Sequence, residues 1–378
     1  MKILQINASY KPAFIYGGPT MSVSILAEQL TKAGVWVNVF TTAANGANEL
    51  PVEINKPVMV DGVKTIYFKR VTKDHTHFSP SLLAHVWRNA RDFDAIHIHA
   101  WWNLVSVLSC LAAVMRNVPV VLSPRGTLSN YSFNNKNSRS KNIIQAVLGR
   151  SLLRKCYIHA TSENELLSVN AIVKSKGSFN IPNFIELGEN KPSVNNEPGD
   201  CLKLIYLSRI EEKKGLNILL DALKTVTVPY KLTIAGDGNA DYVNQLKDIA
   251  VKNNISNKIN WIGFQQQNKF DVLREHDLFI LPSHDENFGN VVIESLSVGT
   301  PVLISEKVGL ADYVKENGMG WICQTNAISV SNAINAIYGN KDMLDAIRVY
   351  APGKIEDDFN ESKLVQRYID MYDKIISA

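Results

Sequence analysis

The fold is decided by one stretch in the second half of the chain, LFILPSHDENFGNVVIE at residues 278–294. Its first four residues are apolar and typical of a buried strand. A turn containing proline, asparagine and glycine follows, and then a second apolar run that suits a helix. Strands that lead directly into helices build parallel sheets, and such sheets bind ligands where their strands end. The stretch therefore predicts an α/β domain with a site at the end of this strand.

Two acidic residues, Glu286 and Glu294, frame that turn with seven residues between them. If the helix starts near Phe288, Gly289 and Asn290, then Glu286 lies in the loop and Glu294 lies about one turn into the helix. Free backbone N–H groups at a helix start suit a diphosphate. Carboxylates beside them accept hydrogen bonds from sugar hydroxyls, so we assign these two to ribose and hexose. The alternative is a pair of acids that only favour the helix dipole.

A second strand-to-helix turn, LSRIEEKKG at residues 207–215, carries basic residues. Arg209 and Lys214 are expected to point at a pair of phosphates, where each charge-assisted hydrogen bond contributes roughly 1.5–3 kcal/mol. The alternative is a solvated charge cluster. Gly236 closes a third strand and permits a tight turn close to a ligand.

The chain length predicts two domains, because 378 residues exceed the usual size of one. Proline, glycine and asparagine gather near the middle of the chain and mark the boundary. We expect the first domain at 1–188, a linker at 189–198 and the second domain at 199–356. Pro352-Gly353 is expected to break the chain before a last amphipathic helix.

Strands and helices alternate in both halves, which indicates parallel sheets. In the first half we expect strands at 3–7, 35–41, 64–68, 95–99, 118–123 and 157–161, and helices at 21–33 and 104–115. In the second half we expect strands at 202–208, 231–235, 259–262, 278–281 and 302–304, and helices at 216–223, 242–251, 291–296 and 362–376.

The first domain offers its own candidate residues at strand ends. Gly17 and Gly18 follow the first strand and can bring backbone amides close to a phosphate or sugar. His99 ends the strand 95–99 on the same side as His97, and Arg125 follows another strand. The alternative for His99 is a buried histidine with its hydrogen bonds satisfied. The Gly-x-Gly-x-x-Gly fingerprint is missing, which argues against a nicotinamide enzyme.

Charge is distributed unevenly along the chain. Residues 1–188 hold 20 Lys and Arg against 10 Asp and Glu, a net charge of +10, whereas the remainder holds 20 against 26, a net charge of −6. The segment 125–162 contains no acid. Within it, 136–155 combines basic residues with an apolar stripe and is expected to meet an anionic membrane surface or an anionic acceptor. The alternative is a surface helix with one buried face. No nucleic-acid motif accompanies the charge.

Other classes of protein are disfavoured by what the sequence holds. No apolar run reaches the ~20 residues of a membrane span, and the start of the chain does not resemble a signal peptide. Asp92-Phe93-Asp94 matches the acidic pattern of metal-dependent sugar transfer, but it precedes a strand and lies at the wrong end of a sheet. Four widely spaced cysteines fit a reducing cytosol better than disulfides or zinc. We expect no metal, no cofactor and a cytoplasmic location.

Taken together, these motifs resemble family GT4, the retaining GT-B glycosyltransferases often described as glycosyl transferases group 1. The resemblance implies an α/β fold of two Rossmann-like, parallel-sheet domains facing across a cleft, with the C-terminal helix region 357–378 completing the first domain. It implies that Glu294 holds the ribose of the donor and that Glu286 contacts the donor sugar. The backbone of Phe288, Gly289 and Asn290 would meet the sugar hydroxyls and the diphosphate.

Further roles follow from the same resemblance. Arg209 and Lys214 match the basic pair on the diphosphate, Gly263-Phe264 matches the loop against the base, and Gly17-Gly18 matches the loop near the diphosphate and acceptor. Many members carry a histidine where this chain has Arg125. Either Arg125 contacts the donor sugar with a fixed positive charge, or the geometry of the acceptor differs.

The implied function is retaining transfer of a hexose from a nucleoside-diphosphate sugar to a hydroxyl of a glycan or lipid-linked acceptor. The expected setting is bacterial surface polysaccharide biosynthesis at the cytoplasmic side of the membrane, with a peripheral membrane contact. The alternatives are a GT-B nucleotide-sugar epimerase and a non-catalytic scaffold that binds sugar nucleotides.

Overall fold

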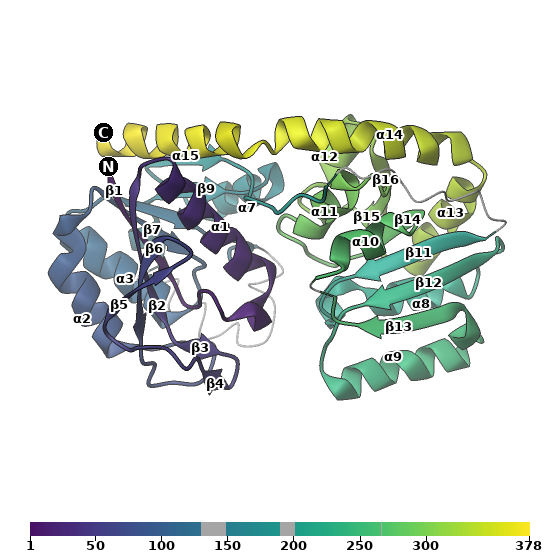
Figure 1. The fold of residues 1–378 in the computed structure, drawn as a ribbon, viewed down its shortest axis with the longest axis horizontal. Coiled ribbons are helices and arrows are strands. Elements are labelled where there is room, and N and C mark those ends of the chain that lie inside the picture. The colour runs from purple at the N-terminus through teal and green to yellow at the C-terminus, as the bar shows by residue number, and fades with distance from the viewer. Residues whose placement is uncertain (130–148, 190–200, 266) are drawn as a thin grey trace. The chain divides into compact units, whose positions relative to one another are not determined.

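The structure is a computed structural model that describes residues 1–129, 149–189, 201–265 and 267–378. It consists of two compact units (Figure 1). Unit 1 comprises Met1–Phe184 and Glu361–Ala378, and unit 2 comprises Ile185–Asn360. The expected boundaries, residues 188 and 357, lie within four residues of these divisions. Most of the expected linker, residues 190–198, lies outside the described residues.

Unit 1 is built on an eight-stranded sheet with the order β10-β9-β8-β7-β1-β2-β6-β5. Neighbouring strands pair in parallel except for β5, which runs antiparallel to β6. The strands are β1 Lys2–Asn7, β2 Trp36–Thr42, β5 Pro57–Val60, β6 Val63–Phe68, β7 Ala95–His99, β8 Val120–Ser123, β9 Tyr157–Ala160 and β10 Gly177–Asn180, with a separate hairpin of β3 Ala44–Asn45 and β4 Asn48–Glu49.

Helices cover both faces of this sheet because successive strand residues point to opposite faces. Alternate residues of β1 and β7, such as Ile6 and Ile98, pack with α2 and α3 in one apolar cluster. Ile3 and Ala95 belong to a second cluster with α1 and α15. The helices are α1 Gly18–Lys32, α2 Pro80–Asn89, α3 Leu104–Met115, α6 Arg150–Leu153, α7 Glu163–Ile172 and α15 Glu361–Ile376.

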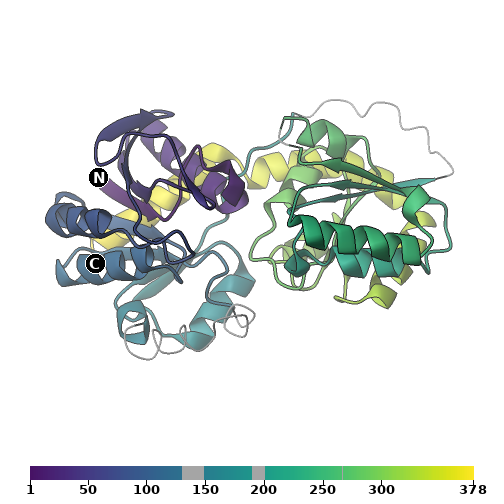
Figure 2. The same cartoon turned by 90° about the horizontal axis from the view of Figure 1, so that it is seen from below.

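Unit 2 holds a six-stranded parallel sheet with the order β13-β12-β11-β14-β15-β16. Helices flank this sheet, which lies in the green part of the chain in Figure 2. Its strands are β11 Leu202–Leu207, β12 Tyr230–Ala235, β13 Ile259–Gly263, β14 Leu278–Leu281, β15 Val302–Ser305 and β16 Gly320–Cys323. Its helices are α8 Leu216–Leu223, α9 Ala240–Lys252, α10 Lys269–Arg274, α11 Asn290–Ser297, α12 Ala311–Glu316, α13 Ala327–Tyr338 and α14 Lys341–Asp358. The two parallel-sheet units confirm the expected fold class.

One expected break is wrong. Helix α14 continues through Pro352-Gly353, and Pro352 is buried within it. A proline inside a helix leaves the carbonyl four residues earlier without its helical partner. That carbonyl belongs to Arg348, and it lies against Gly299, where a Cβ atom would come within 2.6 Å of it. Because Gly299 has no side chain, the Arg348 carbonyl has room to lie against it. Among the described helices, none has the length and apolarity needed to cross a membrane.

Candidate functional site

The loop between β14 and α11 forms as the sequence predicted. Helix α11 begins at Asn290, and Gly289 precedes it with a φ of +94°, a left-handed conformation that suits glycine. Two backbone hydrogen bonds tie the loop to the next one along the sheet. The Glu286 N–H donates to the Lys307 carbonyl at 3.0 Å, and the Gly309 N–H donates to the Glu286 carbonyl at 2.7 Å. The Phe288 ring is buried against Phe359, so this residue presents only its backbone to a ligand.

The carboxylate of Glu286 forms an ion pair with Lys214. Lys214 lies in a short 3-10 helix, Glu212–Lys214, just after β11. Burial raises the pKa of Glu286, but the charges of Lys214, Lys213 and Arg209 outweigh it and bring the pKa below its usual value. Glu286 is therefore ionised at neutral pH. A second pair, Lys213 with Asp285 at 2.7 Å, lies alongside.

The two basic residues expected at the diphosphate, Arg209 and Lys214, differ in burial and in ion-pair partner. Lys214 is mostly buried and neutralises Glu286, whereas Arg209 is half-exposed and pairs with Glu211 at 2.7 Å. Both side chains come from the loop after β11, which is tied to the loop after β14 through the His284 N–H and the Lys213 carbonyl at 2.8 Å. The structure thus brings Arg209, Lys214 and Glu286 to one edge of the sheet.

The second acid, Glu294, has a partner that sequence reasoning missed. Lys269 Nζ lies 3.0 Å from Glu294 Oε1 and 3.1 Å from Glu186 Oε2. Burial raises the pKa of Glu294, and Lys269 opposes that rise. The sequence could have indicated Lys269 by its position, because this residue begins α10 just after β13. It therefore lies at the same edge of the sheet as the other site residues.

Glycines let the loops at this edge approach closely. A Cβ atom on Gly236, whose φ is +152°, would lie 1.9 Å from the Ser208 carbonyl oxygen. One on Gly215, whose φ is +71°, would lie 2.1 Å from the Pro282 carbonyl oxygen. Gly263 adopts a φ of +68° with open space around it, and Phe264 beside it is 60% exposed. This edge of the sheet therefore combines closely packed backbone turns with the exposed aromatic ring of Phe264.

In unit 1, Gly17 and Gly18 lie where β1 leads into α1. Gly17 caps the helix with a φ of +65°, and Gly18 is its first residue. A hydrogen bond of 3.0 Å between the hydroxyls of Ser9 and Thr20 ties the loop to the first turn of the helix. The glycines thus lie at the carboxyl edge of the unit 1 sheet, as expected.

A chain of buried hydrogen bonds runs beneath this edge. The His159 Nε2 lies 2.9 Å from the Ile181 carbonyl, which can only accept, so His159 Nδ1 accepts from the Ser123 hydroxyl at 2.5 Å. Ser123 therefore accepts from His97 Nε2 at 2.6 Å, and His97 Nδ1 accepts from the Tyr372 hydroxyl at 2.7 Å. The chain fixes every proton and fastens α15 to the sheet.

The three histidines of this region, His97, His99 and His159, are neutral. All are fully buried, and burial lowers the pKa of each, that of His159 to about 3. The positive charge of Arg125 lowers each pKa further. The expectation that His97 and His99 share one side is confirmed, since their ring centroids lie 4.3 Å apart.

Arg125 lies at the centre of the unit 1 site. It follows β8 with a φ of +51°, and the next residue, Gly126, donates its N–H to Glu165 Oε1 at 2.7 Å. Its Nε donates to His99 Nδ1 at 3.2 Å, and its Nη1 donates to Ser22 Oγ and Asn183 Oδ1, both at 2.8 Å. Within the described residues Arg125 forms no ion pair.

Because Arg125 can only donate, His99 Nδ1 must accept, and the neutral ring carries its proton on Nε2. That Nε2 is buried without a hydrogen-bond partner among the described residues. An unsatisfied buried donor costs about 1–3 kcal/mol. His99 and Arg125, which were predicted from separate strands, therefore form one hydrogen-bonded pair. In this pair the His99 Nε2–H group has no acceptor among the described residues.

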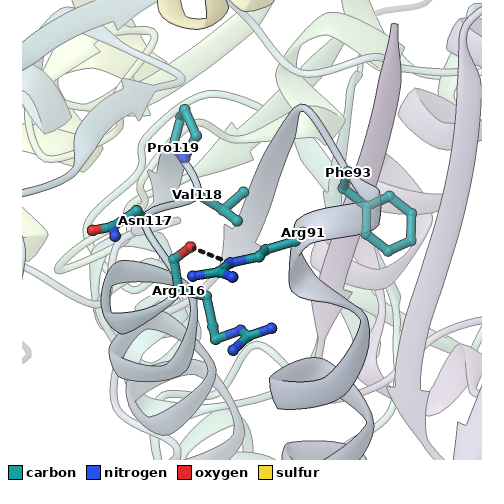
Figure 3. A pocket seen from close by; sticks show the side chains of 6 residues that line it. All are labelled: Arg91, Phe93, Arg116, Asn117, Val118 and Pro119. Carbon is teal, nitrogen blue, oxygen red and sulfur yellow. Dashed lines mark hydrogen bonds between the residues drawn. The ribbon is translucent and has the colours of Figure 1, made fainter.

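The acidic pattern before β7 lies at the opposite edge, as expected. Asp94 accepts a hydrogen bond from the Lys2 N–H at 2.7 Å and follows the short helix Ala90–Asp92. A shallow pocket of about 390 Å³ lies at the same edge (Figure 3) and holds none of the predicted site residues. Its lining residues are Arg91, Phe93, Arg116, Asn117, Val118 and Pro119. The predicted membrane segment 136–155 is described only from residue 149 onward.

Two family models match this sequence. The model described as glycosyl transferases group 1 matches residues 188–354, which include Glu286 and Glu294. The model described as glycosyl transferase 4-like domain matches residues 17–170, which include Arg125. Together the two models cover most of the chain, which is a GT4-type glycosyltransferase. The resemblance inferred from the motifs is thereby confirmed.

Known proteins resemble this glycosyltransferase along nearly its whole length. An uncharacterized glycosyltransferase of Methanocaldococcus jannaschii is 23% identical, and the match covers 98% of each chain. A D-inositol 3-phosphate glycosyltransferase of Corynebacterium urealyticum is 22% identical over 89% of this chain and 86% of its own. The crystal structure of Anabaena HepE in complex with UDP-glucose superposes with a TM-score of 0.77 at 20% identity, covering 99% and 100% of the two chains. These likenesses identify the GT-B fold.

Proposed function

We propose that this glycosyltransferase moves a hexose from a nucleoside-diphosphate sugar to a hydroxyl of a glycan or lipid-linked acceptor, with retention at the anomeric carbon. The observation that carries the proposal is the setting of Glu286 and Glu294 around the start of α11, each paired with a largely buried lysine. Carboxylates held in this way are ready to accept sugar hydroxyls, and the helix start is ready to receive phosphate oxygens.

In this proposal unit 2 binds the donor. Glu294 accepts the ribose hydroxyls, Glu286 contacts the transferred sugar, and the backbone of Gly289 and Asn290 meets the diphosphate. The ring of Phe264, exposed beside Gly263, offers a face on which the base can stack. The binding of UDP-glucose by HepE supports a nucleotide-sugar donor.

The chemistry exchanges one bond for another at the anomeric carbon. The bond to the phosphate oxygen breaks, the acceptor oxygen bonds to the same face, and the acceptor proton passes to the departing phosphate. Stabilising the negative charge that develops on the diphosphate is the main catalytic requirement. Arg209 and Lys214 meet it, so we propose that no divalent metal takes part. Activity in excess EDTA equal to activity with added magnesium supports this, and loss of activity in EDTA refutes it.

The acceptor side is assigned to unit 1. The name of the inositol-phosphate relative supports a polar acceptor, and the excess of basic residues in 1–188 favours an acceptor that carries negative charge. We propose assembly of a bacterial surface polysaccharide, on the cytoplasmic side of the membrane, as the setting.

The first experiment is a panel of UDP, GDP and ADP sugars, measured by thermal shift and by slow release of the nucleoside diphosphate. At about 100 times the dissociation constant, the true donor adds ~2.7 kcal/mol of stability. The Glu294→Ala variant should lose this shift, whereas Glu316→Ala, which alters an exposed acid of the same unit, should keep it. Once the donor is known, proton NMR of the product decides between retention and inversion.

The outcomes separate the alternatives. A donor that is converted to its epimer without an acceptor indicates an epimerase. A donor that binds without turnover, with any acceptor supplied, indicates a scaffold. Failure of every sugar nucleotide to bind refutes the donor site.

A further inference from the structure

Arg125 is an unusual cation for the interior of a protein. It is only partly accessible, and burial lowers the pKa of its guanidinium, yet this group stays protonated at neutral pH. Buried charges are normally paired with an opposite charge. Arg125 forms no ion pair with a carboxylate among the described residues, and the sequence contains no acid from residue 125 to residue 162.

The groups that surround Arg125 are neutral acceptors. His99 Nδ1, Ser22 Oγ and Asn183 Oδ1 take three of its five N–H groups. Glu165, whose negative charge favours the protonated guanidinium, forms its hydrogen bonds elsewhere. Its oxygens accept from the backbone N–H groups of Gly126 and Thr161 and from the Thr161 hydroxyl. The protein therefore holds the guanidinium in a fixed orientation with no carboxylate in contact with it, and the charge of Glu165 acts on it only from a distance.

The two remaining N–H groups are both on Nη2. No described residue accepts from them, and Nη2 is not among the buried unpaired atoms, so solvent or a ligand can reach it. His99, which accepts from Arg125, also carries a buried N–H group on Nε2 that has no partner among the described residues. A rigid cation with free donors and no carboxylate in contact with it is suited to an oxyanion.

The geometry points to a subsite in unit 1 in which Arg125 binds the anionic group, a carboxylate or a phosphate, of the acceptor. This inference rests on the proposed function, in which unit 2 takes the donor. Because Nε and Nη1 are occupied, the oxyanion approaches Nη2 alone rather than both arms of the fork. The acceptor class is thus an anionic sugar, such as a uronate or a sugar phosphate, rather than a neutral glycan.

The test compares three small sugars as probes: methyl glucuronide, glucose 6-phosphate and methyl glucoside. Binding is followed by saturation-transfer NMR at constant ionic strength, with sodium chloride added to the neutral sample. We expect the glucuronide or the sugar phosphate to bind at least tenfold more tightly than the glucoside. Comparing the affinity for the glucuronide with that for the sugar phosphate distinguishes a carboxylate acceptor from a phosphate acceptor.

Variants tie the effect to this residue. Arg125→Gln should abolish the preference for the anionic sugar, whereas Arg125→Lys should retain part of it. Arg91→Gln is the matched control, because Arg91 also lies in unit 1 without an ion pair among the described residues, in the pocket at the opposite edge of the sheet (Figure 3). That variant should keep the full preference.

A thermal-stability reading separates a binding role from a structural one. A cation without an ion pair adds little to stability, so Arg125→Gln should unfold within a few degrees of the parent. An anion that raises the parent's Tm should leave the variant's Tm unchanged. Equal binding of all three sugars by the parent overturns the inference. So does an unchanged anion preference in Arg125→Gln. The donor's thermal shift, which reports on unit 2, shows independently whether the proposed function has failed.

Discussion

At the scale of single residues, the site is a set of buried charges whose partners decide their protonation. Glu294 illustrates this, because burial pushes its pKa up and Lys269 pushes it down. A carboxylate must be ionised to accept two ribose hydroxyls well. The donor site therefore depends on a lysine that does not need to touch the donor.

The first prediction concerns that lysine. Lys269→Met removes the charge that opposes burial, so the pKa of Glu294 should rise further and donor binding should weaken as the pH falls from 8 to 6. Lys269→Arg keeps the charge and should bind donor as the parent does across this range. Donor dissociation constants at several pH values measure the effect. A loss in Lys269→Met that is the same at every pH contradicts the reasoning.

The second prediction concerns the acid itself. Glu294→Gln exchanges a charged acceptor for a neutral one, which removes roughly 1.5–3 kcal/mol of hydrogen bonding. The KM for the donor should rise about 10- to 100-fold. Steady-state kinetics with the donor found in the panel measures it. A change in kcat alone, at constant KM, is inconsistent with a ribose contact.

The third prediction follows from the buried histidines. The folded protein holds His97, His99 and His159 neutral, whereas the unfolded chain protonates them near pH 6.5. Below that pH the unfolded state binds more protons, so stability falls as the pH drops from 6.5 toward 3. Each histidine contributes about 1.4 kcal/mol per pH unit.

Denaturation by urea between pH 7 and pH 5 measures this slope. His159→Gln should show a shallower slope than the parent. The control His75→Gln alters an exposed histidine and should not change it. An identical slope in all three proteins would show that the buried cluster does not govern acid sensitivity.

At the scale of elements, the strand-to-helix turns are built by close backbone contact. Gly215 caps α8, and its Cα approaches the Pro282 carbonyl so closely that no side chain fits. Gly353 is the opposite case, because it lies inside α14 and a Cβ atom added there would meet nothing within 4 Å. Glycine is required in the first place and only tolerated in the second.

The fourth prediction contrasts these two positions. Gly215→Ala should lower the free energy of unfolding by roughly 2 kcal/mol or more, since it combines a backbone clash with a left-handed φ. Gly353→Ala should raise it by about 0.5–1 kcal/mol because alanine favours a helix interior. Equilibrium denaturation measures both, and the idea fails if the two changes have the same sign.

At the scale of the whole molecule, the end of the chain completes unit 1. Helix α15 buries Leu364, Tyr368, Met371, Tyr372 and Ile375 in the apolar cluster shared with α1. Burial of each such side chain contributes roughly 1.5–3 kcal/mol. Their sum is comparable with the whole stability of a domain, about 5–15 kcal/mol.

The fifth prediction is therefore that a chain ending at Asn360 loses the folded unit 1 while unit 2 keeps its own protection. Hydrogen exchange read by mass spectrometry reports on the two units separately. A chain ending at Ile376, which lacks only the exposed Ser377 and Ala378, is the control and should match the full chain. Slow exchange throughout β7 and β8 in the shorter chain would contradict the prediction.

The sequence alone determined most elements of the fold and the place of α11. Apolar runs, helical spacing and turn residues act over a few neighbours, so the strands 278–281 and 95–99 and the helix 216–223 emerged with their observed bounds. The prediction of a break at Pro352 was wrong because the space for the unpaired Arg348 carbonyl is provided by Gly299, which is distant in sequence. Local patterns cannot report such a contact.

Only the tertiary structure decided which charges meet. The sequence located Lys214 and Glu286 at strand ends but could not pair them, and it did not single out Lys269 at all. It singled out His99 and Arg125 separately, whereas the folded sheet joins them and leaves Arg125 without an ion pair among the described residues. The reason is physical: backbone preferences are local, but the protonation and pairing of a buried charge depend on every element packed around it.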